Sequence, residues 1–102
     1  MSMAIQIELD KEALQKFCQK WHIKELSLFG SVLREDFGPD SDVDFLVSFM
    51  PNTQLDIDSF LEMKAELEDQ LGRRVDLVQK EAIRNPWKKS EILETQRVIY
   101  AS

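Results

Sequence analysis

The sequence predicts an α/β (α+β) domain in which helices flank a mixed sheet of three to four strands. Short apolar runs of strand length alternate along the chain with segments whose apolar residues recur at helical spacing. One long helical segment separates the second and third strands, which makes these strands parallel neighbours joined by a crossover. The first and second strands have a short connection, so an antiparallel pair is compatible with it and the sheet is expected to be mixed.

The elements expected in the first half of the chain are, in order, a helix over 8–21, a strand over 25–30, one or two helical turns over 31–36, a turn over 38–41 and a strand over 42–49. The helix is predicted by one apolar stripe from Leu9 to Trp21. Ser31 is the expected N-cap of the helical turns, and the residues Gly-Pro-Asp-Ser have turn chemistry. The strand that follows starts with alternating charge and becomes continuously apolar, as a central strand does when one end meets solvent.

The second half is expected to contain a helix over 55–71, a strand over 73–79, a helix over roughly 87–94 and a candidate fourth strand over 97–100. The first of these helices has its apolar residues at helical spacing, and Gly72 is the expected stop. The dipeptide Asn85-Pro86 divides the tail before the second helix. The closing run is β-branched and aromatic, which favours a strand.

Composition limits the class of protein. The 102 residues suffice for one hydrophobic core, so residues 1–102 are expected to form a single domain, and 43% hydrophobic with 31% charged residues predicts a globular one. A net charge of −6 argues against direct binding to a nucleic-acid backbone but not against a nucleotide held through metal ions. The single Cys18, the lack of a signal-peptide pattern and the lack of a long apolar run predict a cytoplasmic protein that does not enter a membrane.

Three aspartates occupy positions that a sheet can bring together. Asp42 and Asp44 are two positions apart on one strand, so they point to the same face, and Asp76 is in the strand expected alongside. If the register brings Asp76 opposite, the three carboxylates share a few ångströms. Two such charges ~5 Å apart repel by roughly 3 kcal/mol at an effective dielectric of ~20. The cluster must therefore take up protons, pair with arginine or bind divalent cations.

Two interpretations of these aspartates stay open on the residues alone. A D-x-D pair with a third aspartate suits two Mg²⁺ ions about 3.5–4 Å apart, which clamp both oxygens of an in-line phosphoryl displacement. In the other interpretation Asp42 is a solvated strand end, and Asp76 pairs with Arg73 or Arg74.

Gly30 and Ser31 are a candidate phosphate-binding turn. A strand ends and a helical turn begins there, so free N–H groups favour an anion, which can approach Gly30 closely and accept a hydrogen bond from the Ser31 hydroxyl. A tight turn with an ordinary serine cap is the alternative. An EF-hand loop starting at Asp40 is excluded because it would need Gly at Phe45 and Glu at Pro51, and the Walker P-loop pattern is absent.

Together these motifs resemble the DNA polymerase β-like nucleotidyltransferase superfamily. The resemblance rests on Gly30-Ser31-x-x-Arg34, then Ser41-Asp42-Val43-Asp44, then Asp76 in an apolar strand. More closely, the chain is similar to the minimal nucleotidyltransferases, the MNT antitoxins that are paired with HEPN-domain toxins. The likeness runs from the first helix to the closing RVIYA, which is nearly the full chain, and it implies the nucleotidyltransferase (polymerase β-like) fold.

The resemblance implies a role for each matched residue. Asp42 and Asp44 would ligate two Mg²⁺ ions, and Asp76 would ligate the catalytic ion and help to deprotonate the attacking hydroxyl. Gly30 and Ser31 would hold the triphosphate of ATP. The full implied nucleotide-binding set is Gly30, Ser31, Arg34 and Ser41.

The loop around the arginine departs from the family pattern. Many members have small residues there, as in A-R-G, where this chain has Leu33-Arg34-Glu35. The departure leaves the predicted metal site intact and leaves two interpretations of Arg34 open, a nucleotide contact or an ion pair with Asp36 or Asp40.

The resemblance also implies a function. The chain would be a Mg²⁺-dependent protein adenylyltransferase acting as an antitoxin, which transfers AMP from ATP to a tyrosine hydroxyl of a HEPN ribonuclease toxin in a hetero-oligomeric complex. One alternative is an inactive antitoxin that neutralises by binding alone; the three intact aspartates favour the enzyme. Another is transfer to a small molecule, although such relatives carry an extra domain that encloses it. Members that extend nucleic acids likewise carry further domains, for which this chain has no residues.

Three other features have both a functional and a structural interpretation. The segment Trp87-Lys88-Lys89 can contact a partner, since tryptophan is enriched at interfaces, or can cover the core beside solvated lysines. The pair Arg73-Arg74 can neutralise a nucleotide or face water. His22 follows a helix and is expected at the surface without a chemical role.

Overall fold

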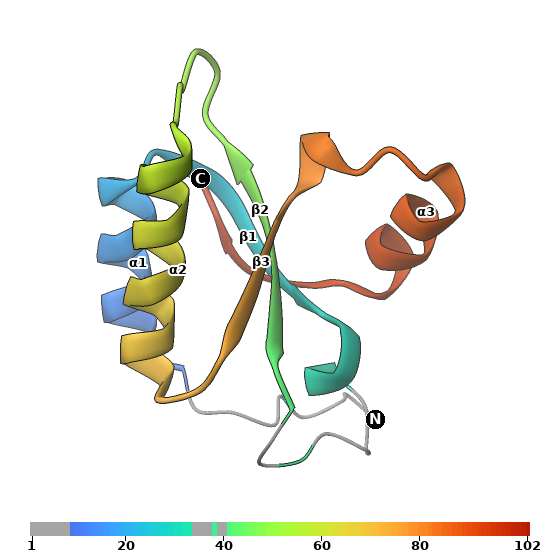
Figure 1. Ribbon diagram of the computed structural model, residues 1–102, viewed down its shortest axis with the longest axis horizontal. Coiled ribbons are helices and arrows are strands. Elements are labelled where there is room, and N and C mark those ends of the chain that lie inside the picture. Colours follow the sequence, from blue (N-terminus) through green and yellow to red (C-terminus); the bar gives the residue numbers. More distant parts are fainter. Residues whose placement is uncertain (1–8, 34–37, 39–40) are drawn as a thin grey trace.

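The computed structural model describes residues 9–33, 38 and 41–102, and of Ser31 only the backbone. The elements in this part of the chain are, in order, α1 (Lys11–Lys20), β1 (Ile23–Phe29), the 3₁₀ helix η1 (Gly30–Leu33), β2 (Val43–Phe49), α2 (Ile57–Leu71), β3 (Val75–Gln79), the 3₁₀ helix η2 (Lys80–Ala82), α3 (Pro86–Thr95) and β4 (Arg97–Ala101) (Figure 1). Among the described residues, no helix is both long and apolar enough to cross a membrane.

The strands form one mixed sheet with the order β3-β2-β1-β4. β1 pairs antiparallel with β2 and with β4, and β2 pairs parallel with β3. The predicted parallel pair across the long helix and the expected mixed sheet are confirmed, and of the three to four strands expected the sheet has four. Because β2 lies between β1 and β3, its one carboxylate, Asp44, is bordered on both sides by other strands.

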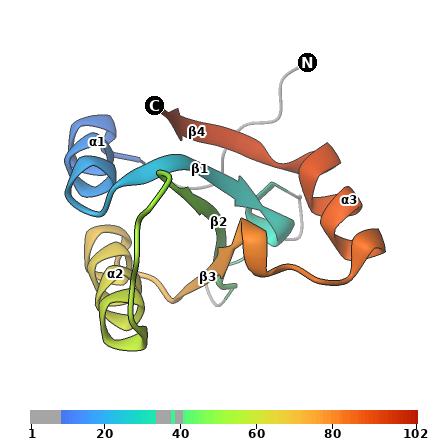
Figure 2. The same ribbon diagram turned by 90° about the horizontal axis from the view of Figure 1, so that it is seen from above.

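Helices cover the two faces of the sheet unequally. Viewed from above, α1 and α2 lie together on one face, and α3 lies alone on the other (Figure 2). The main hydrophobic core fills the space under α1 and α2, because alternate residues of each strand point to that side. Its buried residues are Leu14, Phe17 and Cys18 of α1, Met63 and Leu67 of α2, Ile23, Leu26, Leu28, Val43, Phe45, Val47, Val75 and Leu77 of the strands, and Val32 and Leu33 of η1.

Side-chain caps fix where the helices begin. The Asp10 carboxylate accepts a hydrogen bond from the Ala13 N–H at 3.1 Å, and Asp56 accepts one from the Ser59 N–H at 2.7 Å. Asn85 does the same for α3, so α2 begins at residue 57 instead of 55 and α3 at residue 86 instead of 87. The predicted stop at Gly72 is confirmed: it is the C-cap of α2 in the left-handed conformation, with φ of 65°.

The start and the end of β1 differ from the sequence prediction. His22 has a φ of 57° and reverses the chain after α1, so the strand begins at Ile23 instead of residue 25. Gly30 has a φ of 77°, and the 3₁₀ turn starts on it. Ser31 therefore lies inside the turn and is not its N-cap, which corrects the prediction. His22 is exposed, as expected.

Candidate active site

The sheet register brings two of the predicted aspartates side by side. Asp44 is opposite Phe29 of β1 and opposite Asp76 of β3. Residues that face each other on neighbouring strands point to the same side of the sheet, so both carboxylates lie on the face that carries α3. The prediction that the register would bring Asp76 opposite the D-x-D strand is confirmed for Asp44. Asp44 is half-buried and Asp76 is exposed, so both are accessible to a ligand in the open space beside them.

The turn after β1 lies directly against the Asp44 carboxylate. A Cβ atom on Gly30 would overlap Asp44 Oδ2 and would lie 3.3 Å from Asp44 Cγ. The positive φ of Gly30 is a second reason why only glycine suits this position. Gly30 of one predicted motif and Asp44 of the other therefore meet in space because β1 and β2 are antiparallel neighbours.

Asp42 is held differently from the other two aspartates. It precedes β2, is exposed, and its Oδ1 lies 3.2 Å from Arg74 Nε. The neighbouring Arg73 donates a hydrogen bond from Nη2 to the Gly38 carbonyl at 2.6 Å. Asp42 is exposed, as the second interpretation expected, but Arg74 forms its ion pair with Asp42, whereas that interpretation had paired an arginine with Asp76. Within the described ranges, no group of three or more acidic, cysteine or histidine side chains is gathered around one metal position.

The remaining predicted residues belong to the segment between η1 and β2. The Ser41 hydroxyl accepts a hydrogen bond from the Gly38 N–H at 3.1 Å, and the Ser41 N–H donates to the Gly38 carbonyl at 3.1 Å. Ser41 therefore closes the predicted turn, and its assignment to the nucleotide stays a prediction. Arg34 and the side chain of Ser31 lie outside the described residues.

A cleft of about 510 Å³ opens over Asp44 and Asp76. Its second wall is the segment from η2 into α3, which approaches the sheet from the side opposite α1 and α2 (Figure 1). The cleft is lined on the sheet side by Phe29, Asp44, Asp76 and Val78, and on the other side by Ala82, Ile83, Arg84, Asn85, Lys88 and Ile92.

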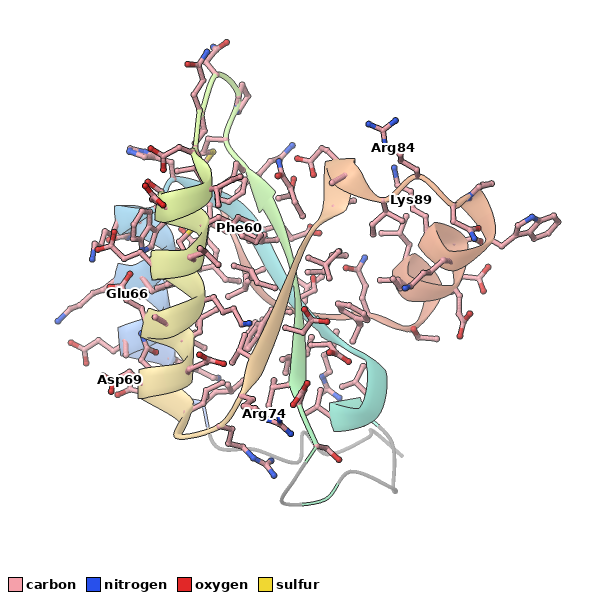
Figure 3. The ribbon with its side chains drawn as sticks, viewed as in Figure 1. Phe60, Glu66, Asp69, Arg74, Arg84 and Lys89 are labelled. Atoms are coloured by element: carbon pink, nitrogen blue, oxygen red, sulfur yellow. The ribbon has the colours of Figure 1, made fainter. Side chains whose placement is uncertain are left out.

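The second wall supplies basic residues that the sequence analysis did not assign to the site. Arg84 extends beyond η2, on the α3 side of the molecule (Figure 3). Lys88 also lines the cleft, whereas the sequence analysis considered it only as a partner contact or a solvated residue. One sequence signal could have found this wall: the segment follows the carboxyl end of a parallel strand, where open α/β sheets bind ligands.

The cleft therefore has two chemically different sides. Carboxylates on the sheet side favour cations, whereas Arg84 and Lys88 on the α3 side favour negative charge. Each side also has apolar surface, from Val78 on the sheet side and from Ile83 and Ile92 on the α3 side. A ligand that carries both a flat apolar group and a phosphate chain with bound cations matches such a cleft.

Comparison with known proteins gives a consistent result. The sequence profile of the family described as nucleotidyltransferase domain matches residues 10–100. A protein of Methanocaldococcus jannaschii is 38% identical over 88 residues, which cover 82% of this chain and 88% of that protein. The protein adenylyltransferase MntA of Thermococcus cleftensis is 37% identical over 76 residues, which cover 74% of this chain and 75% of that protein.

Solved structures share the fold. A crystal structure of a toxin–antitoxin with AMP-PNP aligns with a TM-score of 0.73 at 20% identity, over 92% of this chain and 75% of that chain. A structure of a tri-AMPylated Shewanella oneidensis HEPN toxin in complex with its MNT antitoxin aligns with a TM-score of 0.64 at 19% identity, over 90% of this chain and 70% of that chain. At these identities the likeness concerns the fold, which agrees with the predicted mixed sheet and its flanking helices.

Proposed function

The chain belongs to the nucleotidyltransferase domain family, and from that membership we propose that it is a Mg²⁺-dependent protein adenylyltransferase acting as an antitoxin. In this proposal it transfers AMP from ATP to a tyrosine hydroxyl of a HEPN toxin. The relative named protein adenylyltransferase MntA and the AMPylated HEPN toxin bound to an MNT antitoxin support a HEPN toxin as the protein that is modified. The toxin–antitoxin structure with AMP-PNP supports ATP as the nucleotide.

The observation that carries the proposal is the contact between Gly30 and Asp44 beside Asp76. A turn that accepts no side chain, next to two carboxylates on neighbouring strands, provides adjacent places for a phosphate and its cations. Two like charges on neighbouring strands repel each other, and a divalent cation bound between them would relieve that repulsion.

The donor set fits Mg²⁺. Asp44 and Asp76 would hold the metal, and Asp42 would join them by exchanging its contact with Arg74 for the cation. The bound ions would neutralise the phosphates and lower the barrier to displacement at the α-phosphorus.

Residues of this chain would assist the transfer of AMP from ATP to the acceptor. The acceptor oxygen attacks the α-phosphorus, the bond from that phosphorus to the bridging oxygen breaks, and pyrophosphate leaves. Asp76, exposed at the mouth of the cleft, takes the hydroxyl proton. The backbone of Gly30 and Ser31 receives the phosphate chain, while Val78, Ile83 and Ile92 offer apolar surface to the adenine ring. Arg84 and Lys88 add positive charge on the opposite wall.

The direct test is transfer of AMP to a HEPN toxin, which this proposal expects to be encoded by a neighbouring gene. The purified pair would be incubated with ATP and Mg²⁺, and the HEPN protein weighed by intact mass spectrometry. A gain of one or more AMP masses is expected, and it should disappear in Asp42→Asn. Asp69→Asn removes the same charge from the outer side of α2 (Figure 3) and should leave the gain unchanged.

Two other outcomes would replace the proposal. Suppression of the toxin without any mass gain would mean that the chain neutralises by binding alone. AMP transfer to a small hydroxyl compound, with none to the HEPN protein, would keep the chemistry and change the acceptor.

A further inference from the structure

A second hollow, of about 450 Å³, lies between the start of α2 and the outer edge of β3. Its lining is mainly apolar and includes Ile57, Phe60 and Leu61 of α2 together with Leu77 and Val78 of β3. Phe60 lies on the side of α2 that faces the sheet, whereas Glu66 and Asp69 lie on its other side (Figure 3). We call this hollow the α2–β3 groove.

Two large apolar side chains at the rim of the α2–β3 groove are open to solvent. Ile57 is 78% exposed and Leu61 is 56% exposed. They are four residues apart on α2, so they are neighbours on one side of the helix. Contiguous exposed apolar side chains next to a hollow are typical of a surface that binds another protein.

The α2–β3 groove is continuous with the cleft that holds the aspartates. Val78 and Ala82 line both hollows, so the two share one wall. Asp76 is two positions before Val78 on β3 and points to the same face of the sheet. A polypeptide bound in the groove would therefore lie near Asp76, the carboxylate that would receive the hydroxyl proton.

Backbone and charge around the groove indicate what kind of polypeptide fits. β3 is an edge strand. Its Val75 N–H points away from the sheet and donates a hydrogen bond to Glu68 Oε2 at 3.0 Å. The Leu77 backbone groups, two positions on, face the same way and are suited to an extended segment. Asp56 lines the groove, and α2 itself carries five carboxylates and one lysine. The complementary segment has apolar side chains beside basic ones.

We propose that the α2–β3 groove binds the acceptor protein, through an apolar segment with basic residues that lies next to the modified hydroxyl. The inference rests on the proposed function for the identity of the acceptor. It assigns recognition of the acceptor to side chains such as Ile57 and Leu61 that line the groove but not the cleft, so that docking and chemistry can be changed independently.

The test is a double variant, Ile57→Gln with Leu61→Gln, which removes both exposed apolar side chains with neutral residues that a helix tolerates. Val98→Gln is the matched control, because Val98 is 47% exposed on β4 at the far edge of the sheet. Affinity for the HEPN protein would be measured by calorimetry in an Asp44→Asn background, so that no transfer occurs. We expect a loss of about 10-fold or more in the double variant, the usual size when apolar contacts at the centre of an interface are lost, and none in the control.

Steady-state kinetics on otherwise unaltered protein give the second measurement. The KM for the HEPN protein should rise by a similar factor in the double variant, while the KM for ATP stays unchanged. Unchanged affinity for the HEPN protein would overturn the inference whether or not AMP is transferred. A wild-type dimer that the double variant dissociates, measured by sedimentation, would overturn it in favour of contact between copies of this chain. Absence of transfer with the groove still required for binding would instead refute the proposed function alone.

Discussion

Asp44 and Phe45 are consecutive residues of β2, yet they point to opposite faces of the sheet and meet different surroundings. Phe45 is fully buried under α1 and α2 with Val43 and Val47 on either side. Asp44 faces the cleft under α3, beside Asp76. The period of two along a strand thus lets one segment contribute to the core and to the candidate site at once.

The opposite faces of the sheet explain how a small domain can tolerate adjacent carboxylates. Burying phenylalanine and its aliphatic neighbours contributes roughly 1.5–3 kcal/mol per side chain. We call the face of the sheet under α3 the open face. Repulsion between the two carboxylates on it is of similar size and is reduced by water and counter-ions. Burial on the face under α1 and α2, which we call the closed face, therefore offsets the repulsion on the open face. Substitutions on the closed face should change stability, and substitutions on the open face should change activity.

Separate substitutions of Asp44 and Phe45 should have the strongest effects, one on AMP transfer and the other on stability. Asp44→Asn should reduce AMP transfer by roughly 10⁴-fold, as loss of an essential catalytic group does, and should leave the free energy of unfolding unchanged or slightly higher. Phe45→Ala should lower the free energy of unfolding by about 3–5 kcal/mol. Urea denaturation and the transfer assay would be run on both variants. If Asp44→Asn were strongly destabilised, the division of labour between the faces would be wrong.

A second contrast concerns the thiol of Cys18, which lies on the closed face. Burial raises the pKa of this thiol from 9.0 to about 12, which lowers its thiolate fraction at pH 8 by about 10³-fold. We expect a thiol reagent such as DTNB to react correspondingly slowly with the native protein and at the normal rate in denaturant. Fast reaction of the native protein at pH 8 would show that water reaches the core face.

The third prediction compares two glycines that both have positive φ. At Gly30 a Cβ would meet the Asp44 carboxylate, whereas at Gly72 there is open space within 4 Å. Gly72→Ala should therefore cost only backbone strain, about 1–2 kcal/mol, without loss of transfer. Gly30→Ala should cost at least as much and should also reduce transfer by about 10- to 100-fold, because it displaces a proposed metal ligand. Equal activity of the two variants would contradict the role of the Gly30–Asp44 contact.

Sequence reasoning went furthest where a regular period governs the structure. The strand–helix–strand connection indicated that Asp76 would lie beside the strand of Asp44, and the register confirms this. Alternation along the strand predicted that Asp42 and Asp44 share a face, but Asp42 precedes β2 and this part stays a prediction. The contact between Gly30 and Asp44 follows from the antiparallel pairing. Because a short connection joins β1 to β2, the end of β1 lies beside the start of β2.

Other features depend on contacts that no period encodes. The sequence offers several carboxylates as partners for Arg74. Its ion pair with Asp42 depends on how the side chains lie where β2 and β3 begin. The wall formed by Arg84 and Lys88 depends on how α3 folds back over the sheet. The helix starts are marked by local signals, since Asp56 and Asn85 are N-cap residues directly before the first helical position, which the apolar spacing alone does not locate.

The smallest effect is expected for Arg74, which is 76% exposed in its ion pair with Asp42. Arg74→Ala should change the free energy of unfolding by less than about 1 kcal/mol, because exposed ion pairs are weak. It should lower the half-saturating Mg²⁺ concentration about 2- to 5-fold, since a positive charge beside Asp42 opposes a second cation there. Arg74→Lys keeps that charge and is the matched control. Calorimetric titration with Mg²⁺ measures the effect without transfer, and weaker Mg²⁺ binding in the alanine variant would mean that Arg74 instead holds Asp42 in the orientation that the metal requires.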